Sequence, residues 1–255
     1  MAVLSADRLS GKVLRETAGP DPSWRRLYVA GAVSAALYVL MIIVPLVLMF
    51  TVPQPPLTGG AAVLEYIAAN KAVYLVEFIS FVGLSLPAMV VFLALYVTLK
   101  DLNKSYAALG AVIGIASETI ALAYNSSPPS LNGGLLYLSD QYAAAATEAQ
   151  RSSLATAADS LIAVSNTVNA AGILTALAIL FISLPMFRGV FSRGVAYLGI
   201  ATGVVGIICE ALRDVIGPAY FIYGLLLPAW FIAVGWRLYR LGFGSSQESA
   251  EVTRI

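Results

Sequence analysis

Two carboxylates occupy matching places in two apolar segments of the sequence. Residues 112–118 read VIGIASE and residues 204–210 read VVGIICE, with Gly, Ile and Glu at the same positions. An ionised side chain costs about 2.5–3.5 kcal/mol at the centre of a membrane helix, and such residues usually serve a function. Glu118 and Glu210 are therefore the first candidates for binding a proton or a cation. The matching segments also suggest two parallel repeats, with a chance match between apolar sequences as the alternative.

Other polar side chains fall near the same ends of the apolar segments. Arg213 and Asp214 follow Glu210 at i+3 and i+4, which predicts an ion pair between Glu210 and Arg213. The acids outnumber the nearby cation, so they must be neutralised by protons, hydrated by a vestibule open to the outside, or hold a cation. The alternative is that the acids reach headgroups or loop backbone and that the Asn residues link helices. The remaining candidates for the site are Glu77, Asp159, Asn166 and Asn169.

Composition argues against several kinds of chemistry. The chain has no histidine, which is the commonest metal ligand and the usual general base near neutral pH, and Cys209 is its only cysteine. Carboxylate-only sites are still possible, so the identity of any metal stays open and no cofactor is expected. No P-loop, dinucleotide-binding or metalloprotease pattern occurs. A net charge of +1 gives no reason to expect nucleic acid.

The candidate site residues are positioned by helices that cross a membrane. The chain is 59% hydrophobic and only 11% charged, whereas soluble domains carry about 25% charged residues. About 20 apolar helical residues cross a bilayer. We therefore predict an all-α bundle of six transmembrane helices, occupying residues 26–240 between tails at 1–25 and 241–255. The predicted spans lie near residues 27–51, 73–99, 106–125, 153–185, 194–212 and 215–236.

Lysine and arginine predict the orientation, because cytoplasmic loops retain these residues. The alternating loops carry very unequal numbers of cations, so both termini are expected in the cytoplasm. The cations expected inside are Arg8, Lys12, Arg15, Arg25, Arg26, Lys100, Lys104, Arg188, Arg193, Arg237, Arg240 and Arg254; those expected outside are Lys71, Arg151 and Arg213.

The outer loop at 126–146 contains the helix breakers Pro128, Pro129, Gly133 and Gly134. It is either a plain surface loop or a functional lid. Thr147 and Gln150 then fit a capping box, which predicts that the fourth helix begins there and continues to about residue 185.

Small residues predict where helices pack closely. Gly110 and Gly114 form one GxxxG pattern, and Gly199 and Gly203 form another. These pairs are expected to be packing seams. They are also the candidate surfaces for a homo-oligomer or for a partner in a membrane complex.

Two longer segments carry a family resemblance. The run from Tyr74 through Leu102, with the inner loop DLNKS leading into AALGAVIG, and the later LPMFRGVFSRGVAYLGIATGVVG resemble a prokaryotic multi-pass membrane family, domain of unknown function 4386. The resemblance covers roughly residues 25–242 and implies a six-helix architecture. It implies no activity.

Together these patterns favour a prokaryotic cytoplasmic-membrane protein that binds or transports a small solute or cation through an outward-facing acidic pocket. The alternative is a non-catalytic accessory or assembly subunit of a larger membrane complex. An intramembrane enzyme is a third interpretation, weakened by the absence of histidine.

Overall fold

The computed structural model describes residues 21–53, 56, 59–126, 131–165 and 170–243, and within these ranges the chain is helical with no β-strand. Six described helices are long and apolar enough to cross a membrane, which confirms the predicted all-α architecture. The spans belong to α2 (Arg25–Thr51), α4 (Lys71–Leu99), α5 (Lys104–Ser126), α8 (Ala170–Ser183) with η2 (Leu184–Phe187), α9 (Arg193–Ala211), and η3 (Gly217–Tyr220) with α11 (Phe221–Phe243).

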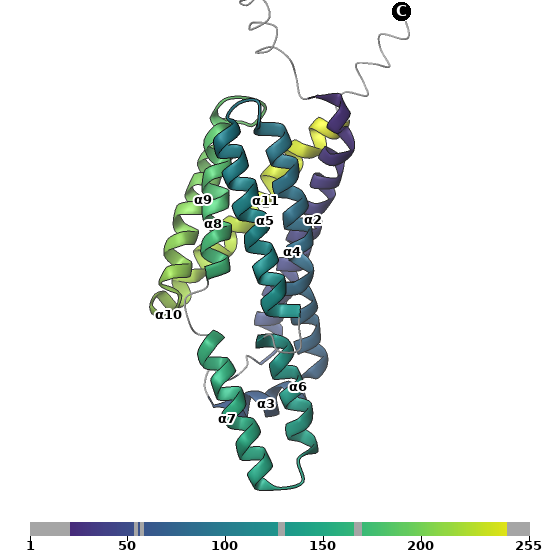
Figure 1. Cartoon of the computed structure of the whole chain (residues 1–255), viewed down its shortest axis with the longest axis vertical. Helices are drawn as coiled ribbons and strands as arrows, with labels where there is room; N and C mark the ends of the chain where they lie inside the picture. The colour runs from purple at the N-terminus through teal and green to yellow at the C-terminus, as the bar shows by residue number, and fades with distance from the viewer. Residues whose placement is uncertain (1–20, 54–55, 57–58, 127–130, 166–169, 244–255) are drawn as a thin grey trace, which may run out of the picture.

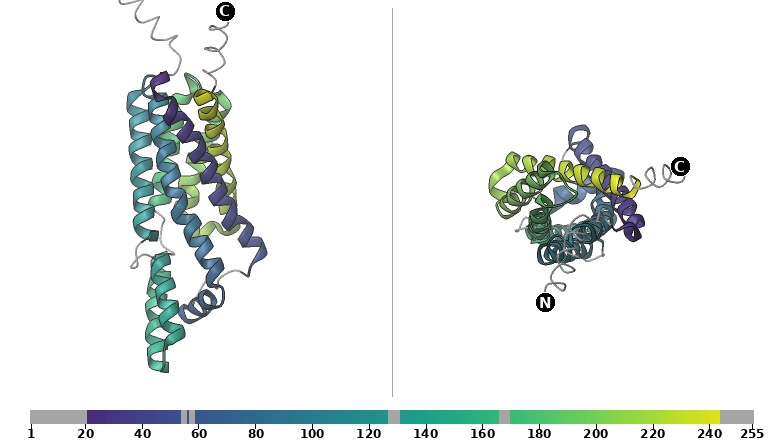
Figure 2. Two further views of the ribbon diagram at one scale, coloured as in Figure 1. Left: turned by 90° about the vertical axis from the view of Figure 1, so that its right-hand side faces the viewer. Right: turned by 90° about the horizontal axis from the view of Figure 1, so that it is seen from above.

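The six spans form a closed ring in chain order. Each packs against the next along the sequence, and α11 closes the ring by packing on both α9 and α2. The right-hand view of Figure 2 looks down this ring. The described chain begins and ends at the same end of the ring, where Arg25 Nε donates a hydrogen bond of 2.7 Å to the carbonyl oxygen of Gly242. A ring of this kind turns one face of every span towards a shared interior.

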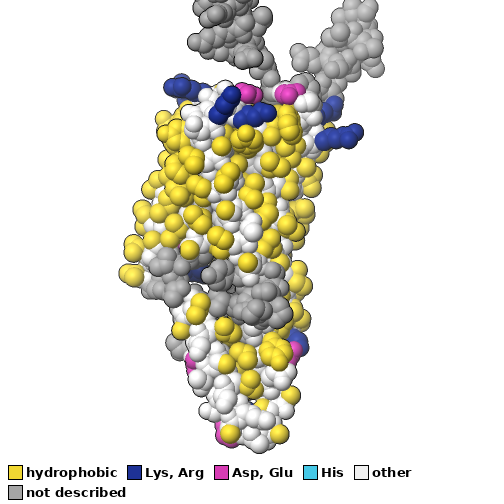
Figure 3. Space-filling model, in the orientation of Figure 1, with side chains coloured by type: hydrophobic (Ala, Val, Ile, Leu, Met, Phe, Trp, Pro, Cys, Tyr) yellow, Lys and Arg dark blue, Asp and Glu magenta, His cyan; other side chains and the backbone are white. Residues whose placement is uncertain are grey.

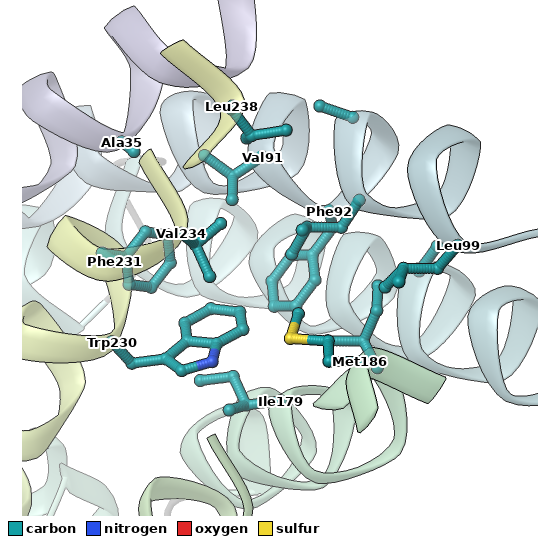
Figure 4. Packing of buried hydrophobic residues seen from close by; sticks show 14 of the residues in the cluster. Ala35, Val91, Phe92, Leu99, Ile179, Met186, Trp230, Phe231, Val234 and Leu238 are labelled. Carbon is teal, nitrogen blue, oxygen red and sulfur yellow. The ribbon is translucent and has the colours of Figure 1, made fainter. Parts of the chain in front are cut away.

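Large apolar side chains fill the interior towards the end where the described chain begins. One buried cluster contains Trp230 and Phe231 of α11, Phe92 of α4, and Ile179 and Met186 of the fourth span, all fully buried (Figure 4). Many large apolar side chains are exposed on the spanning helices, and on the face shown in Figure 3 the Lys and Arg side chains gather at one end. An apolar surface around an apolar core is what a bilayer-embedded bundle requires.

The glycines of the two GxxxG patterns are buried inside the chain. A β-carbon on Gly110 would lie 2.7 Å from Cβ of Ile182, and one on Gly203 would lie 2.8 Å from the carbonyl oxygen of Ala176. Gly114 and Gly199 are similarly close to neighbouring helices. The chain's own helices therefore fill these seams, and a partner would need another surface. The accessory-subunit interpretation stays a prediction.

Three helices form a cap at the end of the ring opposite Arg25: α3 (Gly60–Ala69), α6 (Leu131–Ala144) and α7 (Glu148–Ser165) (Figure 1). Their shared core includes Leu64, Ile67 and Ala158. Lys71 and Asp140 add an ion pair of 2.6 Å between the start of α4 and α6. The cap is thus a small folded unit attached to one mouth of the ring.

The cap corrects two predictions. The segment at 126–146 was predicted as a loop, but α6 occupies most of it because Leu135 and Ser139 pack against α3. The fourth span was predicted to run unbroken over 153–185. Instead, α7, described over Glu148–Ser165, packs in the cap against α3 and α6, and the candidate span is Ala170–Phe187; residues 166–169 between them lie outside the described residues.

The predicted capping box does begin α7. The amide of Gln150 donates to Thr147 Oγ1 over 3.3 Å, and Gln150 Oε1 accepts from the amide of Ala146 over 3.1 Å. The start of the helix was therefore predicted correctly, whereas the packing of α7 against α3 and α6 was not predicted.

Candidate functional site

Glu118 lies in the second half of α5 with its side chain turned into the ring. It is 3% exposed, and its Oε1 accepts a hydrogen bond of 3.4 Å from Thr175 Oγ1 of α8. Its neighbour Ser117 donates to the carbonyl oxygen of Ala171 over 2.6 Å and lies 2.5 Å from Thr175 Oγ1. Ser85 of α4 is close enough to interact with the Glu118 carboxyl group, although its Oγ makes no hydrogen bond of ordinary geometry within the described chain. Hydroxyl groups therefore surround Glu118.

Glu210 lies one residue before the end of α9 and is also 3% exposed. Its Oε1 accepts a hydrogen bond of 2.7 Å from the hydroxyl of Tyr220, which follows in η3. Its Oε2 is buried and has no hydrogen-bond partner among the described residues. The carboxyl group lies directly against Gly172 of α8, because a β-carbon there would be 2.7 Å from Oε2. Only glycine leaves room for the carboxylate at this position.

The two carboxyl groups approach the same stretch of α8. Gly172 and Thr175 are three residues apart and so share a helix face on consecutive turns. Two buried tyrosines, Tyr38 of α2 and Tyr223 of α11, each interact electrostatically with both Glu118 and Glu210. The ring therefore brings together polar side chains from distant parts of the chain. We call Glu118, Thr175, Glu210 and Tyr220 the carboxyl cluster.

The predicted ion pair between Glu210 and Arg213 is not formed. Helix α9 ends at Ala211, and Arg213 begins the separate short helix α10 (Arg213–Ile216), so the i+3 spacing no longer places the two side chains on one face. The exposed guanidinium of Arg213 lies 5.2 Å from the ring centroid of Tyr220 instead. Within the described ranges, no lysine or arginine forms an ion pair with Glu118 or Glu210.

The other candidate acids lie elsewhere. Glu77 is half-buried near the start of α4 and interacts electrostatically with Tyr66 and Tyr74. Asp159 is exposed on α7, and its Oδ1 accepts a hydrogen bond of 2.6 Å from the amide of Gly60 at the start of α3. Asp159 therefore caps the N-terminus of α3.

Three of the remaining predictions cannot be placed. Asn166 and Asn169 lie outside the described residues. Asp214 is described only as part of the backbone of α10.

Sequence reasoning missed the hydroxyl groups around the carboxylates. The predicted site did not include the hydroxyl residues Tyr38, Ser85, Thr175, Tyr220 and Tyr223. The available signal was a hydroxyl side chain inside an otherwise apolar predicted span. Such residues often link helices within membranes, which makes the signal unspecific without coordinates.

The carboxyl cluster has the chemistry to exchange protons or to hold a small cation. No group of three or more His, Cys, Asp or Glu side chains able to hold a metal occurs in the described part of the chain. The cluster instead offers two carboxyl groups with neutral hydroxyl neighbours, and these can exchange protons or share a weakly bound cation with water.

Comparisons with known proteins assign the chain to a family. No curated protein and no solved structure matches the chain. A family model described as "Domain of unknown function (DUF4386)" matches residues 33–243. The match includes the carboxyl cluster and all six spans, except for the first residues of α2. The chain therefore belongs to the DUF4386 family, a family of unknown function whose member here has six membrane-spanning candidates.

Proposed function

We propose that this protein binds and transports a small solute or cation across a prokaryotic cytoplasmic membrane, with Glu118 and Glu210 as its proton or cation sites. One observation carries the proposal. Two buried carboxyl groups from different spans lie against consecutive turns of α8 without a lysine or arginine pairing with either in the described chain.

The energetic argument concerns charge inside a membrane. Burying an unpaired carboxylate costs several kcal/mol or more, so such a group takes up a proton, water or a cation. A structural role alone would be served as well by an uncharged amide that accepts the same hydrogen bonds from Thr175 and Tyr220. Glutamate at both positions is therefore best explained by a need to change charge.

The distribution of cations supports an orientation with both termini in the cytoplasm. Described Lys and Arg residues concentrate at the end of the ring where α2 begins and α11 ends, while Lys71, Arg151 and Arg213 belong to the opposite end. By the positive-inside rule, the cap then faces outward. Glu210, next to the end of α9 on the cap side, would be the outer of the two carboxyl groups of the cluster.

The experiment uses purified protein reconstituted in vesicles that contain a pH-sensitive dye. The variants are Glu118→Gln, Glu210→Gln and the double substitution, because glutamine keeps the hydrogen-bond acceptor but cannot ionise. We expect each single substitution to lower proton or Na⁺-driven flux by about tenfold or more, in line with the loss of a required ionisable group. The variants should still insert and purify as the parent does.

A matched control removes an exposed acid outside the spans. Glu148→Gln, at the start of α7, should leave flux unchanged. Parent-level flux in the double Glu118→Gln/Glu210→Gln variant would overturn the proposal, and so would an equal loss in the Glu148→Gln control.

A further inference from the structure

Five buried side-chain atoms have no hydrogen-bond partner within the described residues, and all belong to the spanning helices. They are Ser85 Oγ, Ser183 Oγ, Glu210 Oε2, Trp230 Nε1 and Arg237 Nε. Roughly 90% or more of buried polar groups in proteins have a partner, and internal water is the usual one when protein atoms do not supply it. Such atoms inside a membrane bundle are therefore the positions where internal water would complete a hydrogen bond.

The positions of these atoms follow the length of the ring. Glu210 lies beside the cap end of α9, and Ser85 lies beside Glu118 in the middle of α4. Ser183 is the last residue of α8, towards the opposite end, and Arg237 is in the last two turns of α11. At a rise of about 1.5 Å per residue, these atoms are spread along the ring, with Ser183 and Trp230 at one level beside Gly199.

Trp230 and Ser183 lie between the carboxyl cluster and the end of the ring near Arg237. Both side chains are fully buried and approach the same glycine, Gly199 of α9. A β-carbon on Gly199 would lie 2.5 Å from Trp230 Nε1 and would overlap Ser183 Oγ. Glycine thus lets an indole N–H and a hydroxyl group come near each other in a region otherwise lined by apolar side chains. Neither donor has a protein acceptor in the described chain.

We propose that internal water molecules bind to these atoms and form a hydrated proton path from the carboxyl cluster to the end of the ring near Arg237. The inference rests on the proposed function and takes the proton as the ion that the protein transports. Each step transfers one proton along a hydrogen bond, from a hydrated proton to a carboxylate oxygen or from a protonated carboxyl group to water, so no bond other than O–H changes.

The surroundings of the carboxyl groups fit this path. The titratable groups that face them are Tyr38 from α2, Tyr220 and Tyr223 from the last span, and Cys209 from α9 itself. Ser85 and Thr175 face Glu118 from α4 and α8. Arg213 lies over Tyr220 at the cap end, so the nearest cation stands outside the cluster and leaves the carboxyl groups free to exchange protons.

Cysteine labelling tests the hydration directly. In a Cys209→Ala background, Ser183→Cys places a thiol at the hydroxyl position, and Ile182→Cys places one at a neighbouring, fully buried position beside Gly110. Thiols react with small methanethiosulfonates as thiolates, which form only where water is present. We expect the Ser183→Cys thiol to react about tenfold faster or more than the Ile182→Cys thiol in reconstituted vesicles. Equal, slow labelling of both would overturn the path.

Two outcomes separate this inference from the proposed function. Labelled Ser183→Cys should lose proton flux, because the attached group blocks the path; full flux after complete labelling would overturn the path even if the site is hydrated. Fast labelling in a protein that shows no flux in any form would instead contradict the proposed function and leave the hydrated site in place.

Discussion

Replacing Gly172 with alanine tests whether the Glu210 carboxyl group is held against α8. The added β-carbon would lie 2.6 Å from Oε1 and 2.7 Å from Oε2 of Glu210, well inside van der Waals contact. The carboxyl group must move, and Tyr220 loses its acceptor at 2.7 Å. Overpacking a buried site costs about 1–3 kcal/mol, and a hydrogen bond to a charged group contributes about 1.5–3 kcal/mol. Replacing glycine with alanine inside a helix by itself stabilises the helix by about 1 kcal/mol.

The net expectation is therefore a loss of about 1.5–5 kcal/mol in the free energy of unfolding, measured by thermal or chemical unfolding in detergent. Gly224→Ala is the matched control, because a β-carbon there meets nothing within 4 Å on α11. This control should be neutral or slightly stabilising. In a Glu210→Ala background the Gly172→Ala penalty should largely disappear, since the clashing group is gone. Equal stability of Gly172→Ala and Gly224→Ala would refute the placement of Glu210.

Two further substitutions test the contacts around the site and the cap. Tyr220→Phe removes the hydroxyl that donates to Glu210 and should lower the unfolding free energy by about 1.5–3 kcal/mol, whereas Tyr137→Phe at an exposed ring should change it little; an identical small effect of both would contradict the hydrogen bond. Asp159→Ala removes the acceptor for the Gly60 amide and should destabilise the cap by about 0.5–2 kcal/mol. Hydrogen exchange should then quicken in α3 but not in α8, and uniform quickening would argue against a local capping role.

The six spans could be predicted from the sequence because they depend on the length of the apolar segments. Each span is long and apolar enough to satisfy its own backbone in lipid, so its existence follows from composition alone. Glu118 and Glu210 stood out for the same reason, since a charge is conspicuous where other side chains are apolar. The structure places both carboxyl groups against α8, at Thr175 and Gly172.

The cap was beyond sequence reasoning because its helices have only 10, 14 and 18 residues and are held by contacts with one another. The apolar residues of α7 run on towards α8 in the sequence, which made one long span appear continuous. The actual partners of α7 are α3 and α6, and such tertiary contacts leave no local signal. The error at Arg213 is similar, because i+3 spacing has meaning only if the helix continues past Ala211.

Closure of the ring by its last helix has a consequence for how the protein is made. During synthesis α5, α8 and α9 leave the ribosome before α11, so Glu118 and Glu210 enter the bilayer before Tyr220, Tyr223 and Trp230 are available to cover them. Until α11 docks on α2 and α9, this open bundle exposes two acids along an unsealed side. The two acids are therefore enclosed only after the last helix has been made and has packed on α2 and α9.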